Sequence, residues 1–384
     1  MPLDQYLPFG KPDIGPEEIQ AVTRVMQSGW VGMGNETVTF EQELATFAQA
    51  ETVVTVNSCT SALFLSLLIE GIGQGDEVIV PTMTWCSSAN SAMYLGAKPV
   101  FCDVDPDTLC LTPETVMPHV TSKTRAVVVV HYGGLTVDIA ALRRALPQRI
   151  KIIEDAAHAL GSTYANGQSV GSSGALTCFS FYANKNLSTA EGGAIALNDP
   201  ERGNHLRSLR LHGLPVDAWK RFTHPKVLLR SADLTELGYK LNYTDLQAAI
   251  GRVQLRRQGE FAQRRLEVAR VYCEGLHNIH PGISWQTGLL DPGHARHLFV
   301  IKLPDGIAIS RDEFILALRE KNVGASIHYA PLHRMPLYGI SHQRLPVSED
   351  LYERIVTLPI SASMSAEQAY AVLDAVAQVL QDEK

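Results

Sequence analysis

The sequence lacks the features that mark membrane-spanning, nucleic-acid-binding and secreted proteins. No stretch approaches the roughly 20 consecutive apolar residues that a helix needs to cross a bilayer. No long basic run is present and the formal net charge is −7, so we expect no nucleic-acid partner. The N-terminal residues show no basic segment followed by an apolar one, so no signal peptide is expected. These absences predict a globular protein of the cytoplasm with no membrane partner.

Cysteine patterning excludes two further classes of protein. The chain has six cysteines and no CxxC spacing, so neither a disulfide framework nor a bound metal is expected. Most of these cysteines lie in apolar surroundings, which is typical of reduced thiols in a core. We find no internal repeat or low-complexity tract. The 384 residues, 45% of them apolar, are enough for two domains with substantial cores.

Over the first 200 residues, short β-branched runs alternate with helical stretches. ETVVTV precedes TSALFLSLLIEGI, for example, and KIIED precedes AAHAL. This alternation predicts βαβ units and a mostly parallel sheet. The run VVVV lacks a period of two, as expected for a strand covered on both faces. Ligands of such sheets bind beyond the carboxyl ends of the strands, and four residues follow predicted strands there: Thr60, Trp85, His131 and Asp155.

The pattern changes near residue 174. ALTCFSFY and GGAIAL predict two strands that flank a loop, and a polar, loop-rich segment covers residues 213–242. Residues 245–276 have apolar positions at helical spacing and predict one long helix or two helices. A smaller unit follows, with strands expected near HLFVIKL and ASIHY and helices near RDEFILALREK and AEQAYAVLDAVAQVLQ. We therefore predict a large α/β domain over residues 1–250 and a small C-terminal α+β domain over 251–384, which includes the joining helix.

Lys185 and Asp155 are the pair of residues that carries most information about chemistry. Lys185 lies in a loop between two apolar runs, thirty residues after an acid that ends an apolar strand. Pyridoxal 5′-phosphate (PLP) needs an amine to hold its aldehyde as a Schiff base and a carboxylate to keep its pyridine nitrogen protonated. The pair therefore indicates a PLP site. Taken singly, Lys185 fits a solvated loop lysine and Asp155 fits a helix N-cap.

A phosphate site is predicted where a strand meets the next helix. The segment NSCTSALFLSLL places Ser58, Thr60 and Ser61 at the start of a helix, where free N–H groups and the helix dipole favour an anion. Ordinary N-capping explains the same residues. Ser180, just before Lys185, would add a hydroxyl at the same anion.

Two ring-bearing side chains complete the candidate set. Trp85 follows a predicted strand and could stack on a flat cofactor ring, although a core or interface tryptophan fits equally. His158 lies three residues after Asp155, one turn along the predicted helix, and should face the same side. A histidine satisfied within that helix is the plainer explanation.

The ordered set of motifs resembles the DegT/DnrJ/EryC1/StrS family of sugar aminotransferases, which are fold-type I PLP enzymes. The matching segments run nearly end to end: SGWVGMG, NSCTSAL, PTMTW, VFCDVD, HYGG, IEDAAHALG, SFYANKN, AEGG, GYKLNYTDLQAAIG, HLFVIKL and HYAPLH. Within the family, the pattern is most similar to the branch that makes UDP-4-amino-4-deoxy-L-arabinose.

The resemblance implies a role for each matched residue. Lys185 binds the cofactor aldehyde and later carries protons, while Asp155 pairs with the pyridine nitrogen. His158 contacts the phenolic oxygen side of the ring, and Trp85 stacks on it. The phosphate is bound by three hydroxyl residues: Thr60, Ser61 and Ser180.

Two further residues are assigned by the same resemblance. Asn242, in GYKLNYTD, reaches the cofactor phosphate of a neighbouring subunit, which implies a homodimer with shared active sites. The alternative for Asn242 is a residue that only precedes the helix beginning near Asp245. His328, in HYAPLH, contacts substrate from the smaller domain.

The chain also departs from the family pattern. Met33, Gly34 and Asn35 follow SGW where the family often has Thr-Gly-Pro, and Tyr182 stands where the arabinose branch often has histidine. Both differences lie near the expected substrate position. They place the arabinose assignment in question and leave the PLP chemistry intact.

The resulting prediction is a PLP-dependent aminotransferase. It would move the amino group of L-glutamate to a keto-sugar that is linked to a nucleotide, which yields an amino sugar and 2-oxoglutarate. Lipopolysaccharide, capsule and antibiotic synthesis all remain open as destinations.

Three alternatives stay open at this point. A sugar dehydratase of the same family would replace the lysine with histidine, which Lys185 argues against. The HYGG, AEGG and GYKLNYTD segments disfavour another fold-type I enzyme, such as an aldolase or a desulfurase. A non-catalytic PLP-binding regulator would be expected to carry a DNA-binding appendage, and none is visible.

Overall fold

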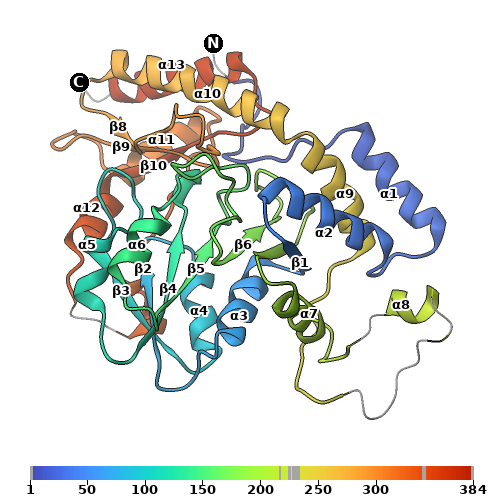
Figure 1. Cartoon of the computed structure of the whole chain (residues 1–384). Coiled ribbons are helices and arrows are strands. Elements are labelled where there is room, and N and C mark those ends of the chain that lie inside the picture. The colour runs from blue at the N-terminus through green and yellow to red at the C-terminus, as the bar shows by residue number, and fades with distance from the viewer. Residues whose placement is uncertain (1–2, 216–217, 224–225, 227–233, 340–342, 382–384) are drawn as a thin grey trace.

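The computed structural model describes residues 3–215, 218–223, 226, 234–339 and 343–381. Part of the polar segment predicted over 213–242 therefore lies outside the described residues. A seven-stranded sheet forms the centre of the larger part of the molecule (Figure 1). Its strands are β1 (Thr52–Val56), β2 (Glu77–Pro81), β3 (Lys98–Cys102), β4 (Thr124–Val130), β5 (Lys151–Asp155), β6 (Leu176–Ser180) and β7 (Gly193–Leu197).

The spatial order of the strands is β1-β7-β6-β5-β4-β2-β3. Strand β7 runs antiparallel to β1 and β6, and the other pairings are parallel. The predicted α/β fold with a mostly parallel sheet is therefore confirmed. The loop that carries Lys185 connects β6 to β7, which are antiparallel neighbours in the sheet.

Helices cover both faces of this sheet. Apolar runs without a period of two, such as VVVV, predicted this arrangement. In β4, Ala126 and Val128 belong to the core beneath α3 and α4, while Val127 and Val129 belong to the core beneath α5 and α6. The helices of this part are α1 (Pro16–Ser28), α2 (Asn35–Ala48), α3 (Cys59–Ile69), α4 (Ser87–Met93), α5 (Pro113–Val116), α6 (Ile139–Ala145), α7 (Pro200–Leu209) and α8 (Ala218–Thr223).

Two local predictions are wrong. AAHAL does not form a helix: residues 157–158 and 160–161 form turns, because the backbone N–H of Ala156 bonds the carbonyl of Cys178 on the neighbouring strand at 2.8 Å. ASIHY does not form a strand. Within it, only Ser326 forms a bridge, to Thr357. In both segments tertiary contacts override the local sequence preference.

The C-terminal residues build a second core around an antiparallel sheet of order β10-β9-β8. Its elements are β8 (Ser284–Trp285), β9 (Phe299–Lys302), α11 (Arg311–Glu320), α12 (Pro346–Arg354), β10 (Ile355–Leu358) and α13 (Ala366–Gln381). Leu3 and Leu7, from the opposite end of the chain, also pack against this core. The predicted small α+β unit is thus present, and the boundary near residue 250 stays a prediction.

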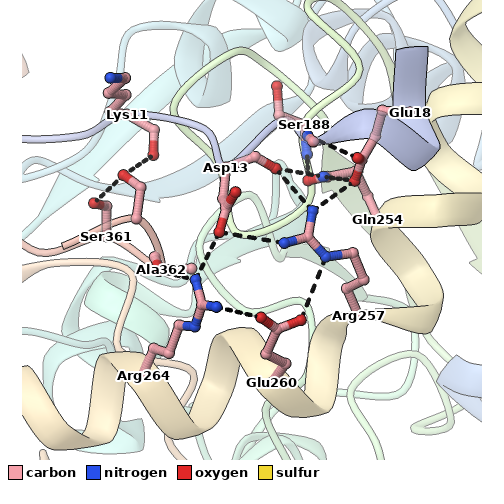
Figure 2. A network of polar contacts seen from close by, with 12 residues as sticks. Lys11, Asp13, Glu18, Ser188, Gln254, Arg257, Glu260, Arg264, Ser361 and Ala362 are labelled. Atoms are coloured by element: carbon pink, nitrogen blue, oxygen red, sulfur yellow. Dashed lines mark hydrogen bonds and ion pairs between the residues drawn. The ribbon is translucent and has the colours of Figure 1, made fainter. Parts of the chain in front are cut away.

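Two consecutive helices join the units. Of the two arrangements predicted for residues 245–276, one long helix or two helices, the second is found. Helix α9 (Asp245–Arg256) packs against α1 and α2, and α10 (Gln258–Ile279) packs against α13 (Figure 1). Arg257 lies at the break between them. Its guanidinium contacts Glu18 Oε1 at 2.8 Å and Asp13 Oδ2 at 3.3 Å (Figure 2). The joint is therefore tied to the N-terminal segment by charge.

Candidate active site

A cavity of about 530 Å³ lies beyond the carboxyl ends of the parallel strands. This is the position at which open α/β sheets bind ligands. Residues at or just after the ends of β1, β2, β4, β5 and β6 line it: Ser58, Trp85, Val130, Asp155 and Ser180. His328 and Tyr329, from the C-terminal unit, line the same cavity.

Most of the predicted site residues meet at this cavity. Seven of the nine line it: Thr60, Trp85, Asp155, His158, Ser180, Lys185 and His328. Ser61 and Asn242 are not among its lining residues.

Lys185 is held in a turn between β6 and β7, where its backbone N–H donates to the carbonyl of Tyr182 at 2.9 Å. Burial lowers the pKa of the amine to about 8, although Asp155 and Cys59 act in the opposite direction. An amine with such a pKa has a substantial neutral fraction near neutral pH, and a neutral amine can act as a nucleophile or base.

The loop around Lys185 is anchored from behind by the joint of α9 and α10. Gln258 Nε2 donates to the carbonyl of Asn186 at 3.0 Å, and the N–H of Ser188 donates to Gln254 Oε1 at 3.5 Å. Figure 2 shows Gln254 between Ser188 and Glu18. The position of Lys185 is therefore coupled to the packing of the two units.

Asp155 is a buried carboxylate without a cationic partner. Its side chain accepts from Ser88 Oγ at 2.7 Å and from the N–H of Ala157 at 3.1 Å. Among the described residues, no basic side chain pairs with it within 4.0 Å, and Asp155 is 5% exposed. Burial raises the pKa of this carboxyl, and the two hydrogen bonds together with the nearby Lys185 offset that only in part. A protonated ring nitrogen would supply the missing charge.

The start of α3 has the geometry expected of an anion site. Ser58 is its N-cap and accepts from the N–H of Ser61, which is the ordinary N-capping that the sequence offered as the alternative. Thr60 Oγ1 lies 2.7 Å from Ser87 Oγ on the cavity wall. Ser61 Oγ instead donates to Asn57 Oδ1 at 2.7 Å, so its hydroxyl proton is already used.

Gly193 lets the first residue of β7 pass directly beneath this helix start. A Cβ at Gly193 would lie 2.5 Å from the backbone nitrogen of Cys59 and 2.5 Å from the carbonyl carbon of Ser58. The AEGG motif thus serves a close backbone approach that only glycine permits.

His158 has a defined tautomer. The N–H of Gly133 donates to its Nδ1 at 3.3 Å, and burial lowers the pKa of the ring well below its usual value. The neutral ring therefore carries its proton on Nε2 and donates it to Tyr329 Oη, 3.0 Å away. The hydroxyl proton of Tyr329 is then available to a ligand in the cavity.

Trp85 and His328 differ in their surroundings. Trp85 is 61% exposed at the cavity, with its ring centroid 6.1 Å from that of Tyr329. His328 is buried, and its Nδ1 lies 2.8 Å from Thr357 Oγ1. Burial lowers the pKa of His328 to about 3, so it is neutral in the physiological range.

Asn242 lies half-buried just before α9. The preceding carbonyl, that of Leu241, accepts from the N–H of Asn57 at 2.9 Å, which places this segment beside the end of β1. The role of Asn242 stays a prediction.

Sequence reasoning missed several residues at the site. Ser87 and Ser88 begin the helix α4 shortly after β2, two and three residues beyond Trp85, so the rule of carboxyl ends could have found them. Tyr329 is adjacent to the predicted His328. Phe9 lines the cavity from the N-terminal segment, and no local signal marks it.

The cavity fits PLP in three separate respects. Asp155 lacks a cation, Lys185 offers an amine of lowered pKa, and hydroxyls gather where a helix begins. Within the described residues, no group of three or more His, Cys, Asp or Glu side chains could hold a metal ion. None of the described helices is long and apolar enough to cross a membrane.

Comparison with known proteins extends the likeness over the whole chain. Residues 12–377 match the model of the DegT/DnrJ/EryC1/StrS aminotransferase family. The chain is 40% identical over 384 residues to the spore coat polysaccharide biosynthesis protein SpsC of Bacillus subtilis, which covers 98% of each chain.

Solved structures show the same likeness. The aminotransferase TlmJ from Streptoalloteichus hindustanus superposes with a TM-score of 0.89 at 33% identity, covering 99% of this chain and 100% of the other. The putative sugar aminotransferase Spr1654 from Streptococcus pneumoniae, in its pyridoxamine phosphate (PMP) form, has a TM-score of 0.90 at 30% identity over 98% and 100% of the two chains. Its PLP form has a TM-score of 0.88 at 30% identity over 99% and 100%.

Proposed function

Because this chain belongs to the DegT/DnrJ/EryC1/StrS aminotransferase family, we propose that it moves the amino group of L-glutamate to the keto group of a nucleotide-linked sugar. It is a PLP-dependent sugar aminotransferase of fold-type I. The products of the proposed reaction are an amino sugar and 2-oxoglutarate.

One observation carries the proposal: the amine of Lys185 and the unpaired carboxylate of Asp155 face a single cavity. A PLP-dependent transferase needs both groups at opposite ends of one ring. The similarity to a protein named for spore coat polysaccharide biosynthesis supports a sugar as the amino acceptor. Lys185 also argues against the dehydratase alternative, in which histidine takes its place.

The residues of the chain divide the work at the bound cofactor. PLP, when bound, withdraws electrons from the carbon that loses or gains a proton. Asp155 keeps the proton on the ring nitrogen, and the hydroxyls near the start of α3 would hold the phosphate. Lys185, with a pKa of about 8 set mainly by burial, takes up a proton and returns it.

We further propose a homodimer with shared active sites. Among the described residues between α7 and Asn242, three large apolar side chains are highly exposed: Phe222 is 71%, Leu234 61% and Leu237 83% exposed. Exposed apolar residues in one segment favour an association surface. The six free cysteines favour a reducing compartment, and we propose that the reaction occurs in the cytoplasm.

The test is amine transfer with purified protein in its PMP form, assayed against a panel of nucleotide-linked keto-sugars. The expected result is an amino sugar and the return of the visible absorbance of PLP. Glutamate should then regenerate the PMP form faster than other amino acids do.

Borohydride reduction provides the control. It should attach PLP covalently to Lys185, and Lys185→Ala should lose amine transfer. Labelling of a different lysine would reject the assignment of the active site. Transfer of amine to none of the keto-sugars would reject the proposed substrate class.

A further inference from the structure

His297 lies beside the amine of Lys185. Its Nε2 is 3.4 Å from Lys185 Nζ, at the long end of the hydrogen-bonding range, and the residue is 4% exposed. We propose that His297 is a positioning residue that presents an unprotonated Nε2 to Lys185 and stabilises the ammonium formed when Lys185 takes up a proton. The inference rests on the proposed function in one respect, that Lys185 is the reacting amine.

A chain of hydrogen bonds determines the tautomer of His297. The carbonyl of Ala295 can only accept, so the Asn186 amide directs its Nδ2 toward that oxygen, at 2.8 Å. Asn186 Oδ1 then faces His297 Nδ1 at 3.1 Å, and this oxygen can only accept as well. Nδ1 therefore carries the proton. In a neutral imidazole the other nitrogen has the lone pair, and that nitrogen faces Lys185.

Burial keeps His297 neutral. It lowers the pKa of the imidazole well below its usual value, and the nearby Lys185 and His158 act in the same direction. The rings of His158 and His297 lie 4.5 Å apart. The titratable and charged groups around Lys185 and His297 come from several elements: Asp155, Cys59, His158, His328 and Arg265. Only Asp155 among them brings a negative charge, and it faces Lys185.

The backbone of His297 is fixed by the HYGG turn. Its N–H donates to the carbonyl of Gly133 at 2.9 Å, and the N–H of Ala295 donates to the carbonyl of Gly134 at 3.2 Å. Gly134 has a φ of +106°, and a Cβ there would lie 2.9 Å from the backbone nitrogen of Arg296. The two glycines thus allow the segment before β9 to approach closely, which restricts the imidazole to its place beside Lys185.

The proposed role predicts the direction in which the pKa of Lys185 changes when His297 is replaced. An acceptor at Nε2 stabilises the ammonium form of Lys185 more than the neutral amine, so it raises the pKa of the lysine. Without it, burial would lower that pKa further. Because a hydrogen bond to a charged group is lost, we expect the pKa of Lys185 to be about one unit lower in His297→Asn than in the wild-type protein measured in the same form.

The variant His297→Asn removes only part of the interaction. The asparagine amide can still donate to Asn186 from the place of Nδ1, but no atom reaches Lys185. In the matched variant His297→Gln, the longer amide reaches the place of Nε2 and can still accept. We therefore expect the pKa of Lys185 in His297→Gln to stay closer to the wild-type value.

The pKa is measured by competitive labelling of the full-length protein in its PMP form, in which the Lys185 amine is free. Traces of acetic anhydride are added between pH 6 and 10, and labelled peptides are quantified by mass spectrometry. The exposed residues Lys98 and Lys123 serve as internal references. If His297→Asn yields no folded protein, His297→Phe replaces it, because the ring volume is kept without a nitrogen and the same fall is expected.

A fall in the pKa that His297→Gln largely restores supports the proposal. An unchanged pKa in His297→Asn would show that His297 only packs in the wall, and a raised pKa would show that it carries positive charge. Either result overturns the inference. No amino donor or sugar enters the experiment. A failed sugar assay with a normal shift would therefore reject the proposed substrate and retain the role of His297.

Discussion

At the active site Asp155 is buried and Lys185 is half-buried, and the two side chains form no ion pair within 4.0 Å. Burial lowers the pKa of the amine and raises that of the carboxyl, so both shifts favour the uncharged forms. A ligand that presents an aldehyde at one end and a protonated nitrogen at the other relieves both costs at once. PLP is specified by what each side chain lacks, an aldehyde for the amine and a cation for the carboxylate, and not by a contact between the two.

Asp155→Asn tests this reasoning at one residue. The substitution keeps the shape and the bond from Ser88 but removes the charge that holds the ring proton. We expect turnover to fall by more than about tenfold, since an opposite charge beside the nitrogen is worth more than about one pKa unit. PLP occupancy, measured by absorbance, should change much less. Near-normal turnover in Asp155→Asn would exclude this role.

Gly193→Ala tests the close approach beneath α3. The new methyl group would meet backbone atoms of Ser58 and Cys59 at about 2.5 Å, and backbone cannot move aside as a side chain does. We expect the free energy of unfolding to fall by about 1–3 kcal/mol, as for overpacked cores, and the affinity for PLP to fall with it. Thermal denaturation and cofactor titration measure the two effects. Gly259→Ala, in the first turn of α10 with open space around it, is the control: it should leave the affinity for PLP unchanged and should not lower the free energy of unfolding, since alanine favours a helix over glycine.

At the scale of elements, the break between α9 and α10 connects the N-terminal segment to the loop of Lys185. Arg257 binds Glu18 and Asp13, and Arg264 Nη1 binds the same Asp13 carboxylate at 2.8 Å (Figure 2). Glu18 is 1% exposed. Burial alone would raise the pKa of Glu18, but hydrogen bonds from Arg257 and from the N–H of Gly15 outweigh it and hold the pKa below its usual value.

Arg257→Met should leave Glu18 buried without its cation. The expected loss in the free energy of unfolding is about 2–3 kcal/mol, less than the roughly 3–5 kcal/mol for a fully buried pair, because a fifth of the Arg257 side chain is exposed. The stability contributed by Glu18 is present above its unfolded pKa and is lost as pH falls through the lower folded pKa. In Arg257→Met the effect of burial is no longer outweighed and raises the folded pKa of Glu18, so this acid-side loss should shrink, and part of the stability lost at neutral pH should return as pH falls through that raised pKa.

Denaturant unfolding at several pH values measures both effects. Adding Glu18→Gln to Arg257→Met should recover part of the loss at neutral pH, since no buried charge is then left. If the double variant is as unstable as the sum of the two single variants, the two residues do not act as a pair.

The sequence predicted those parts of the site that depend on local pattern. Apolar runs located the ends of the parallel strands, so the sequence alone predicted that Thr60, Trp85 and Asp155 lie at the same edge of the sheet. The contact of His297 with Lys185 could not be predicted, because the two residues are 112 positions apart in the chain. The glycines of the HYGG turn that hold His297 in place indicate only a close backbone approach. The helix predicted over AAHAL failed because Ala156 continues the hydrogen bonding of the sheet, which no local pattern reveals.

At the scale of the whole molecule, the cavity receives side chains from both units. Asp155 ends a strand of the large sheet and Lys185 lies in the loop between β6 and β7, while His328 and Tyr329 come from the segment between α11 and α12, and Phe9 comes from the N-terminal segment. The same N-terminal segment packs against the second core through Leu7. Motion of one unit relative to the other would therefore change the walls of the cavity.

The proposed shared site can be tested with hybrid dimers. Asn242 can donate from its amide to a phosphate oxygen, and we propose that it does so in the site of the partner subunit. Lys185→Ala and an Asn242 variant severe enough to abolish activity are each inactive alone. When they are mixed and allowed to reassociate, one site of each hybrid keeps both native residues.

A statistical 1:1 mixture should then recover about one quarter of wild-type activity, because half of the dimers are hybrids with one working site of two. Native mass spectrometry would establish that the hybrids form. Hybrids without activity would show that Asn242 serves its own subunit.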